Sequence, residues 1–375
     1  MKKVAMIIPR IPNPRTLKRI KVLEKHVNVI LIYWDRDLPV KEEFDINPIN
    51  VVHGIKVKAP EGKPLKRILP LLVFWKVVYK QLRIQGPLIL HVENLDMLIL
   101  ACLYKKFSNK QVKIIYEVAD LPKYSFRVSG RFKNIVFSCF RKFEQKIISS
   151  ISNIILTSPY FWEVYYSDFV DESKYLFLPN APSKKLFASY EKQKNEIFTI
   201  GFIGSVRYVK QLKMLIDAVG EMDKNIKVFI AGSGPGYQVI AEYIKDKPWV
   251  EMHGPYNYEQ EIVSLYEKVD CVYSVYDTEL ENVKVALPNR LYEAIVCELP
   301  IIAAKGTALG KFIEEKEIGA TVGANDKEGL KSILTKWVSD ENLIQQYSFS
   351  CKLIKEDYYY ENNSDKLLEL YRNLA

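Results

Sequence analysis

Short apolar runs alternate with helix-like segments along the whole chain, and this rhythm restricts the fold more than any other feature. The apolar runs include residues 4–9, 27–34, 88–92, 112–118, 197–205, 226–234 and 301–304. Buried strands that alternate with helices are typical of parallel sheets covered on both faces. The sequence therefore predicts an α/β protein with doubly wound parallel sheets.

The alternation occurs twice, which predicts two domains in a chain of 375 residues. A polar, lysine-rich segment at residues 181–195 separates the two series of runs and is the predicted linker. We expect a first domain over residues 1–180, a second over 196–362, and a terminal helix over 363–375.

Charge is distributed unevenly between the two halves. Residues 1–190 hold 32 basic and 16 acidic residues, a net charge of +16, whereas the rest hold 22 and 29, a net charge of −7. The first half is therefore expected to meet an anionic partner. No nucleic-acid recognition motif is visible, so we expect no nucleic acid, and an anionic membrane surface fits at least as well.

The five cysteines form no C-x-x-C motif and no metal-like pairing with the four histidines. They predict buried free thiols in a reducing, cytoplasmic compartment, with no metal site and no cofactor. The amino-terminal Met-Lys-Lys precedes only five apolar residues, which predicts a first strand rather than a signal peptide. No apolar run approaches the ~20 residues that a transmembrane helix needs.

Residues 286–306, with the sequence ALPNRLYEAIVCELPIIAAKG, predict a helix, a buried strand and a glycine turn. Arg290 and Glu293 lie one turn apart on that helix. They form either an exposed ion pair or part of a ligand site, because ligands of open parallel sheets bind at the carboxyl ends of strands.

PNRLYEAIVCELPII resembles the donor-binding signature of the retaining glycosyltransferases of family 4, P-N-K-L-x-E followed by P-V-I. The resemblance implies a GT-B fold of two Rossmann-like domains, with a terminal helix that returns to the first. It also implies that Glu293 binds the ribose diol of a sugar nucleotide and that Arg290, beside Asn289, helps neutralise the diphosphate. One departure is Val285, where many members have an acidic residue.

Further donor-binding residues follow from the same resemblance. The turn in GFIGSVRYVK is similar to the family's phosphate-binding turn, GSGPG to its G-x-G-P turn, and HGPY to its base-contacting segment. Each also has a simpler interpretation, as exposed charges, a tight glycine turn or a structural histidine. The residues implied are Gly204, Arg207, Lys210, Gly234 and Tyr256. Separately, residues 304–310, AKGTALG, place free amides at a predicted helix amino terminus, so Thr307, Ala308 and Leu309 are candidates for contact with a phosphate or the donor sugar.

Acceptor-side residues are expected in the first domain. HVENLDML and YEVADLPKY follow two successive strands and resemble strand-end motifs of the family. They make His91, Glu93, Asp96 and Asp120 candidates, with Asp120 the first choice for contact with the donor sugar or acceptor. Each is equally explained as a helix cap or a satisfied polar residue.

Two segments, residues 64–83 and 123–143, interleave aromatic residues with Lys and Arg. Such segments bind anionic lipid headgroups. The alternative for the first is an ordinary helix whose core-facing stripe includes Leu69, Leu72, Val73 and Trp75.

The expected function is a retaining, metal-independent glycosyltransferase that moves a sugar from a nucleotide-diphosphate donor to a carbohydrate or lipid-linked acceptor in surface polysaccharide synthesis. Asp120, Lys210 and Arg290 are the expected catalytic residues, the two cations stabilising the leaving diphosphate. The alternatives are a nucleotide-sugar epimerase of the same fold and a non-catalytic nucleotide-sugar-binding subunit.

Overall fold

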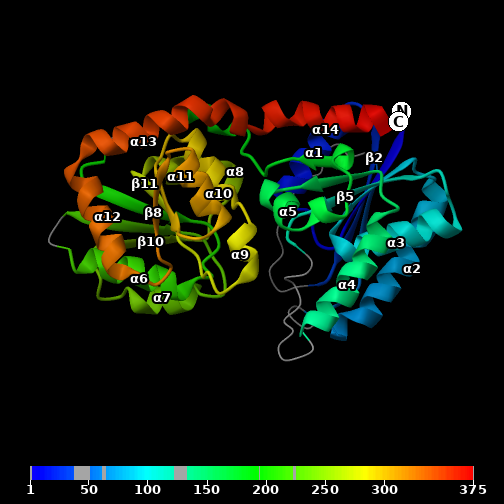
Figure 1. Ribbon diagram of the computed structural model, residues 1–375, viewed down its shortest axis with the longest axis horizontal. Coiled ribbons are helices and arrows are strands. Elements are labelled where there is room, and N and C mark those ends of the chain that lie inside the picture. The colour runs from blue at the N-terminus through cyan, green and yellow to red at the C-terminus, as the bar shows by residue number, and fades with distance from the viewer. Residues whose placement is uncertain are drawn as a thin grey trace. The chain divides into compact units, whose positions relative to one another are not determined.

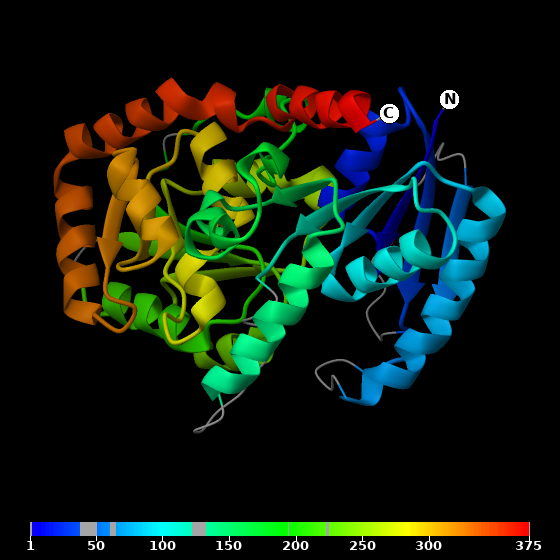
Figure 2. The same cartoon turned by 45° about the vertical axis from the view of Figure 1, so that its right-hand side comes forward.

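The computed structural model describes residues 2–37, 51–60, 65–121, 133–193, 195–222 and 225–374. The chain divides into two compact units. Unit 1 comprises Met1–Leu178 and Ser364–Ala375, and unit 2 comprises Pro179–Asn363. Each unit contains one parallel sheet with helices on both faces (Figures 1 and 2).

Unit 1 contains a seven-stranded sheet in the order β3-β2-β1-β4-β5-β6-β7, with every pair parallel. The strands are β1 (Lys3–Ile8), β2 (Asn28–Asp35), β3 (Val51–Lys56), β4 (Ile89–Glu93), β5 (Lys113–Val118), β6 (Asn153–Leu156) and β7 (Tyr175–Phe177). The order reverses between β1 and β4, which makes their carboxyl ends the expected ligand-binding edge.

The helices of unit 1 cover its two sheet faces unequally. They are α1 (Pro14–Leu23), α2 (Ile68–Gln85), α3 (Asn94–Phe107), α4 (Lys133–Ile148), α5 (Pro159–Val164) and the last part of α14 (Tyr360–Leu374). Helices α2, α3 and α4 lie side by side on one face (Figures 1 and 2). Apolar side chains of α1 and α14, including Ile20, Leu23, Leu367 and Tyr371, share one core with β1 and β2 on the other face.

Unit 2 contains a six-stranded parallel sheet in the order β10-β9-β8-β11-β12-β13. The strands are β8 (Phe198–Ile203), β9 (Ile226–Ala231), β10 (Val250–Gly254), β11 (Cys271–Ser274), β12 (Ile301–Ala304) and β13 (Gly319–Val322). Here the order reverses between β8 and β11. Their carboxyl ends are therefore the edge at which a ligand is expected.

Eight helices are described in unit 2. They are α6 (Val209–Gly220), α7 (Tyr237–Tyr243), α8 (Tyr258–Glu267), α9 (Glu281–Val285), α10 (Asn289–Val296), α11 (Ala308–Glu315), α12 (Lys327–Ser339) and α13 (Glu341–Ile354). Helices α6 and α12 pack together over a core that includes Phe202, Leu215, Ile230 and Trp337. The predicted pair of doubly wound parallel sheets is thus confirmed.

Two expectations about side chains are wrong in part. Leu69, Leu72 and Val73 are exposed on α2, and its buried residues are Phe74, Val78 and Leu82, so the predicted core-facing stripe is displaced around the helix. All five cysteines are free thiols, but Cys139 is exposed and Cys102 is only half-buried. Within the described residues, no helix is both long and apolar enough to cross a membrane.

Candidate functional site

The candidate donor site begins at the turns that follow β8 and β9, which pack tightly against each other. Gly204 has φ +131° and Gly232 has φ +135°, and a Cβ atom on Gly232 would lie 1.9 Å from the Gly204 carbonyl oxygen. The Gly204 amide donates to the Ala231 carbonyl at 2.8 Å. Gly234, with φ +147°, leaves no space for a Cβ beside Val206. Glycine is therefore required here because the two backbones approach closely.

Arg290 projects from α10 against the first of these turns. A Cβ atom on Gly204 would lie 2.7 Å from Arg290 Nη2, so a larger residue here would displace the guanidinium. Arg290 Nη1 donates to the Tyr273 carbonyl at 3.2 Å, and the guanidinium carbon lies 3.9 Å from the Phe202 ring centroid. The side chain is buried, so its charge is held at the carboxyl ends of β8 and β11.

An aromatic pair extends this arrangement. The rings of Tyr208 and Tyr276 stack with centroids 4.7 Å apart, and the Arg290 guanidinium carbon lies 5.4 Å from the Tyr276 centroid. Cation–π contacts of this kind stabilise a guanidinium most where it is desolvated. This pair could not be predicted from the sequence, because the two tyrosines are 68 residues apart and only the fold brings them together.

Glu293, one turn beyond Arg290 on α10, is buried and accepts two hydrogen bonds. Tyr258 donates to Oε1 and Tyr266 to Oε2, each at 2.8 Å. Burial and the neighbouring Glu293 charge raise the pKa of both tyrosines well above the usual value, so they remain protonated donors. The alternative of an exposed ion pair with Arg290 is therefore wrong, because both side chains are buried and α8 supplies the two hydroxyl donors to Glu293.

Tyr256 lies just beyond β10, close enough to Glu293 and Arg290 to interact with both charges. Burial, followed by Glu293, raises the pKa of its hydroxyl, and Arg290 opposes the rise. The three residues named from the same resemblance thus lie in one electrostatic neighbourhood within unit 2.

The two remaining basic candidates are exposed at the start of α6. Arg207 Nε donates to Ser205 Oγ at 3.0 Å, and Lys210 lies in the first turn of the helix. Cations beside a helix amino terminus and next to Gly204 would add to the attraction for a phosphate.

The amino terminus of α11 is only partly available. Thr307 caps the helix: its hydroxyl accepts from the Gly310 amide at 3.0 Å and donates to the Ala304 carbonyl at 2.7 Å. Thr307, Ala308 and Leu309 are buried, so their side chains contribute packing and any ligand contact is left to the backbone. Asn289 is exposed at the first residue of α10 and contacts the Asn180 amide at 2.6 Å.

Val285, the departure from the family pattern, ends α9 and is buried. Its apolar side chain packs in the unit, whereas the acidic residues Glu279 and Glu281 nearby are exposed.

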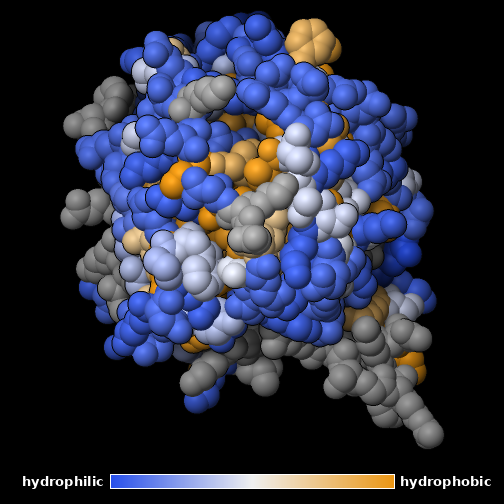
Figure 3. Space-filling view, turned by 90° about the vertical axis from the view of Figure 1, so that its left-hand side faces the viewer, coloured by the Kyte–Doolittle hydropathy of each residue, from blue (hydrophilic) through white to orange (hydrophobic). Residues whose placement is uncertain are grey.

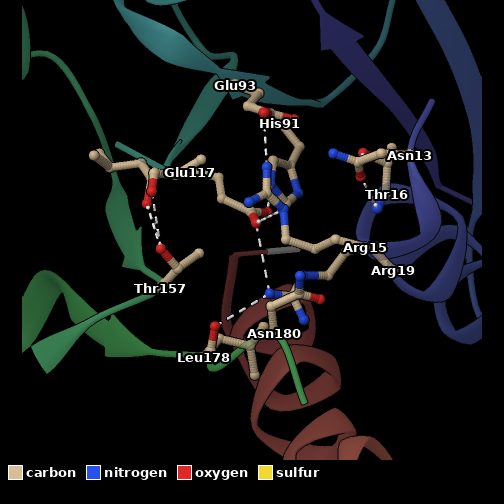
Figure 4. A network of polar contacts seen from close by, with 12 residues as sticks. Asn13, Arg15, Thr16, Arg19, His91, Glu93, Glu117, Thr157, Leu178 and Asn180 are labelled. Atoms are coloured by element: carbon tan, nitrogen blue, oxygen red, sulfur yellow. Dashed lines mark hydrogen bonds and ion pairs between the residues drawn. The ribbon is translucent and has the colours of Figure 1, made fainter. Parts of the chain in front are cut away.

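The acceptor-side candidates His91 and Glu93 lie at the carboxyl end of β4 inside a buried network (Figure 4). His91 Nε2 lies 3.0 Å from Glu117 Oε2, and Nδ1 lies 2.6 Å from the Tyr371 hydroxyl. Arg15 bridges the two carboxylates, 2.6 Å from Glu93 and 3.2 Å from Glu117. His91 is therefore a satisfied structural residue in this network, and it joins β4 to α14.

Two further arginines complete the network. Arg10 pairs with Glu93, and Arg19 lies 3.5 Å from Glu117. Burial alone would raise the pKa of Glu117, but Arg19, Arg15 and His91 together hold it well below its usual range. The Glu117 carboxylate therefore remains charged inside unit 1.

Asp96 and Asp120 lie nearer the surface. Asp96 is in the first turn of α3, where burial raises the pKa of its carboxyl to about 6, although Arg67 at 4.0 Å opposes the rise. Asp120 is exposed two residues beyond β5 and interacts electrostatically with Arg15. Of the four acceptor-side candidates, these two are the more accessible.

A pocket of about 350 Å³ lies at the opposite edge of the unit 2 sheet. Its lining includes Ile197, Thr199, Val228 and Glu251, at the amino ends of β8, β9 and β10. On the face drawn in Figure 3, hydrophilic side chains predominate and hydrophobic atoms gather in a hollow near the centre. None of the predicted donor residues lines the 350 Å³ pocket at the amino ends of β8, β9 and β10.

Comparison with known proteins identifies the family to which unit 2 is similar. Residues 197–340, all within unit 2, match the family described as Glycosyl transferases group 1. Unit 2 therefore contains a group 1 glycosyltransferase domain. This segment of the glycosyltransferase contains both glycine turns, Arg290 and Glu293.

Three proteins resemble the chain over most of its length. The succinoglycan biosynthesis protein ExoL of Rhizobium meliloti (strain 1021) is 23% identical over 306 residues, which cover 77% of this chain and 74% of ExoL. Sucrose-phosphate synthase from Thermosynechococcus elongatus has a TM-score of 0.76 at 14% identity, over 100% of this chain and 99% of that one. Anabaena HepE in complex with UDP-glucose has a TM-score of 0.72 at 12% identity, over 100% of both chains. The glycosyltransferase therefore has the GT-B fold.

Proposed function

We propose that this glycosyltransferase binds a nucleotide-diphosphate sugar in unit 2 and transfers the sugar, with retention and without a metal, to an acceptor bound by unit 1. The observation that carries the proposal is the position of Arg290. Its buried guanidinium lies against Gly204 at the switch point of the sheet, with Glu293 one turn further along the same helix.

The proposed chemistry follows from these charges. Negative charge on the diphosphate grows as the glycosidic bond breaks, so a guanidinium fixed beforehand stabilises the transition state more than the ground state. Lys210, Arg207 and the first amides of α6 would add to this field. Glu293 would accept hydrogen bonds from the ribose hydroxyls, because a carboxylate has two acceptor oxygens.

Retention is proposed to follow front-face attack, in which the leaving phosphate accepts the proton of the incoming hydroxyl. No protein side chain then has to act as a base. Asp120 is proposed as the contact from unit 1 to the donor sugar or acceptor, because it is exposed beyond β5 at the carboxyl edge of that sheet.

The donor and acceptor classes are proposed from the relatives. HepE is described in complex with UDP and with UDP-glucose, and ExoL is a succinoglycan biosynthesis protein. Both descriptions fit a nucleotide-diphosphate hexose as the donor. They also fit a carbohydrate or lipid-linked acceptor in surface polysaccharide synthesis.

Nucleoside diphosphate release tests the proposal. Purified protein is incubated with UDP- and GDP-sugars and candidate acceptors, with and without chelator, and product stereochemistry is determined by NMR. Acceptor-dependent release with a retained anomeric configuration supports it. Donor isomerisation would favour an epimerase, donor binding without turnover would favour a binding subunit, and loss of activity in chelator would contradict the metal-free reaction.

An anionic cytoplasmic membrane is the proposed partner of unit 1. The amino-terminal half of α2 exposes Ile68, Leu69, Leu72 and Val73, with Leu69 75% exposed. Lys76, Lys80 and Arg83 are exposed further along the same helix. An apolar end beside a row of cations fits a bilayer surface, where each cation near anionic lipid contributes about 1 kcal/mol. The segment around residues 123–132 lies outside the described residues, so it adds nothing here.

Liposome co-sedimentation tests this partner. We expect binding to anionic vesicles at low salt, little binding to neutral vesicles, and loss of binding at high salt, because the attraction acts within a Debye length. Leu69→Glu with Leu72→Glu should abolish binding, whereas Val239→Glu, at an exposed site on α7, should not. Protein that stays in the supernatant with anionic vesicles at low salt would contradict membrane docking.

A further inference from the structure

Helix α8 approaches Glu293 with two tyrosines placed eight residues apart. Because eight residues span a little over two turns, Tyr258 and Tyr266 lie on the same face of the helix. They donate one hydrogen bond to each oxygen of the same carboxylate, both at 2.8 Å. Donation from both sides fixes the plane of the carboxylate.

The two tyrosines differ in their distance from solvent. Tyr266 is fully buried and contacts Oε2, whereas Tyr258 is half-buried and contacts Oε1. Glu293 itself is 5% exposed. A ligand that approaches from solvent would therefore meet the Oε1 side of the carboxylate, next to the Tyr258 hydroxyl.

Both carboxylate oxygens keep acceptor capacity after these contacts. An ionised carboxylate has about four lone-pair sites, and the tyrosines occupy two of them. The directions of the remaining lone pairs are determined by the two hydrogen bonds from the tyrosines. The orientation of Glu293 is thus set by α8, although the residue belongs to α10.

We propose that Tyr258 is a positioning residue for nucleotide recognition, which orients Glu293 so that its free lone pairs accept from the ribose 2′- and 3′-hydroxyls. This inference rests on the proposed donor site and adds to it the residue that gives the carboxylate its direction. Tyr266 anchors the deep oxygen and acts mainly on stability, because its removal would leave a fully buried acceptor without its donor.

The test compares nucleotides with and without the 2′-hydroxyl. UDP and GDP, each against its 2′-deoxy analogue, are titrated calorimetrically into the wild-type chain, Tyr258→Phe and Tyr243→Phe. Tyr243 is the matched control because it donates to Asp217 at 2.6 Å, also a tyrosine–carboxylate bond in unit 2, away from α10.

The wild type is expected to bind the ribonucleotide about 10- to 100-fold more tightly, the range for hydrogen bonds to a charged group. Tyr258→Phe should reduce this ratio at least about threefold, and it should weaken the 2′-deoxy nucleotide less than the ribonucleotide, because only the 3′-hydroxyl of the 2′-deoxy nucleotide can contact Glu293. Tyr243→Phe should keep the wild-type ratio.

Four results would overturn the inference or its basis. A wild-type ratio retained in Tyr258→Phe, or an equal loss for both nucleotides, would show that Tyr258 has only a structural role. A wild type that binds both nucleotides equally would contradict the contact between Glu293 and the ribose 2′-hydroxyl. A wild type that binds neither would contradict the proposed donor site itself.

Discussion

Replacing Glu117 by glutamine removes the negative charge that faces Arg15 and Arg19 inside unit 1. Arg15 lies 3.2 Å and Arg19 3.5 Å from Glu117 Oε1, and all three side chains are buried. Arg15 keeps Glu93 at 2.6 Å, so the charge most affected is that of Arg19, and breaking a buried ion pair costs about 3–5 kcal/mol. For a unit of this size, about 2–4 °C is lost per kcal/mol, so we expect the melting temperature to fall by about 6–20 °C.

The same carboxyl makes the stability of unit 1 depend on pH. Because the folded pKa of Glu117 lies well below its ordinary value of 4.5, its stabilisation is complete above that value and is lost as pH falls below it. Glu117→Gln should therefore remove part of the acid sensitivity as well as lower the stability at neutral pH.

Hydrogen exchange measured by mass spectrometry can localise the effect. Peptides from β5 and α1 should lose protection in Glu117→Gln, whereas peptides from the unit 2 sheet should not. Glu221→Gln is the matched control, because Glu221 also contacts two cations, Lys327 and Lys331, but on the exposed surface of unit 2. Unchanged melting and unchanged protection of β5 in Glu117→Gln would refute the argument.

Other substitutions test the donor site and the thiols. Glu293→Gln should weaken nucleotide binding and also lower stability by about 1.5–3 kcal/mol, because an amide nitrogen cannot accept from a tyrosine hydroxyl; calorimetry and thermal melting measure the two effects, and an unaltered affinity would remove Glu293 from the site. Lys210→Ala and Arg290→Ala should each lower kcat more than they raise KM in steady-state kinetics, and a normal kcat with raised KM would show that the cation only binds. A maleimide should label the exposed Cys139 in the native protein well before Cys271, and equal rates at the two thiols would contradict their burial.

Sequence periodicity was sufficient for most of the fold. The central strands were predictable because they are short, continuous apolar runs, as strands buried on both faces must be, whereas β3 (VVHGIK) and β10 (VEMHG) at the sheet edges contain polar residues. Helix α9 was missed because it has only five residues, and the outward face of α2 because its exposed positions are as apolar as its buried ones. Leu69 and Phe74 are both apolar, and only the packing of α2 makes the first exposed and the second buried.

The site was predictable where backbone requirements or motif spacing determine the residue. Gly204 and Arg290 belong to recognisable motifs and are adjacent in the structure. Tyr258 and Tyr266 were missed because their function depends on which helix lies over Glu293, a tertiary contact that no local pattern encodes. Their spacing of eight residues on a helix was the available signal.

Helix α14 is synthesised last but completes the core of unit 1, so the order of synthesis affects how this unit folds. Leu367, Leu370 and Tyr371 belong to the core of unit 1, yet the ribosome makes them after all of unit 2. Domains generally fold in the order in which they emerge. In this chain, unit 1 cannot complete its apolar core, and His91 cannot contact Tyr371, until the last residues leave the ribosome. A nascent chain stalled before residue 364 should therefore attract chaperones through unit 1, the part that was translated first.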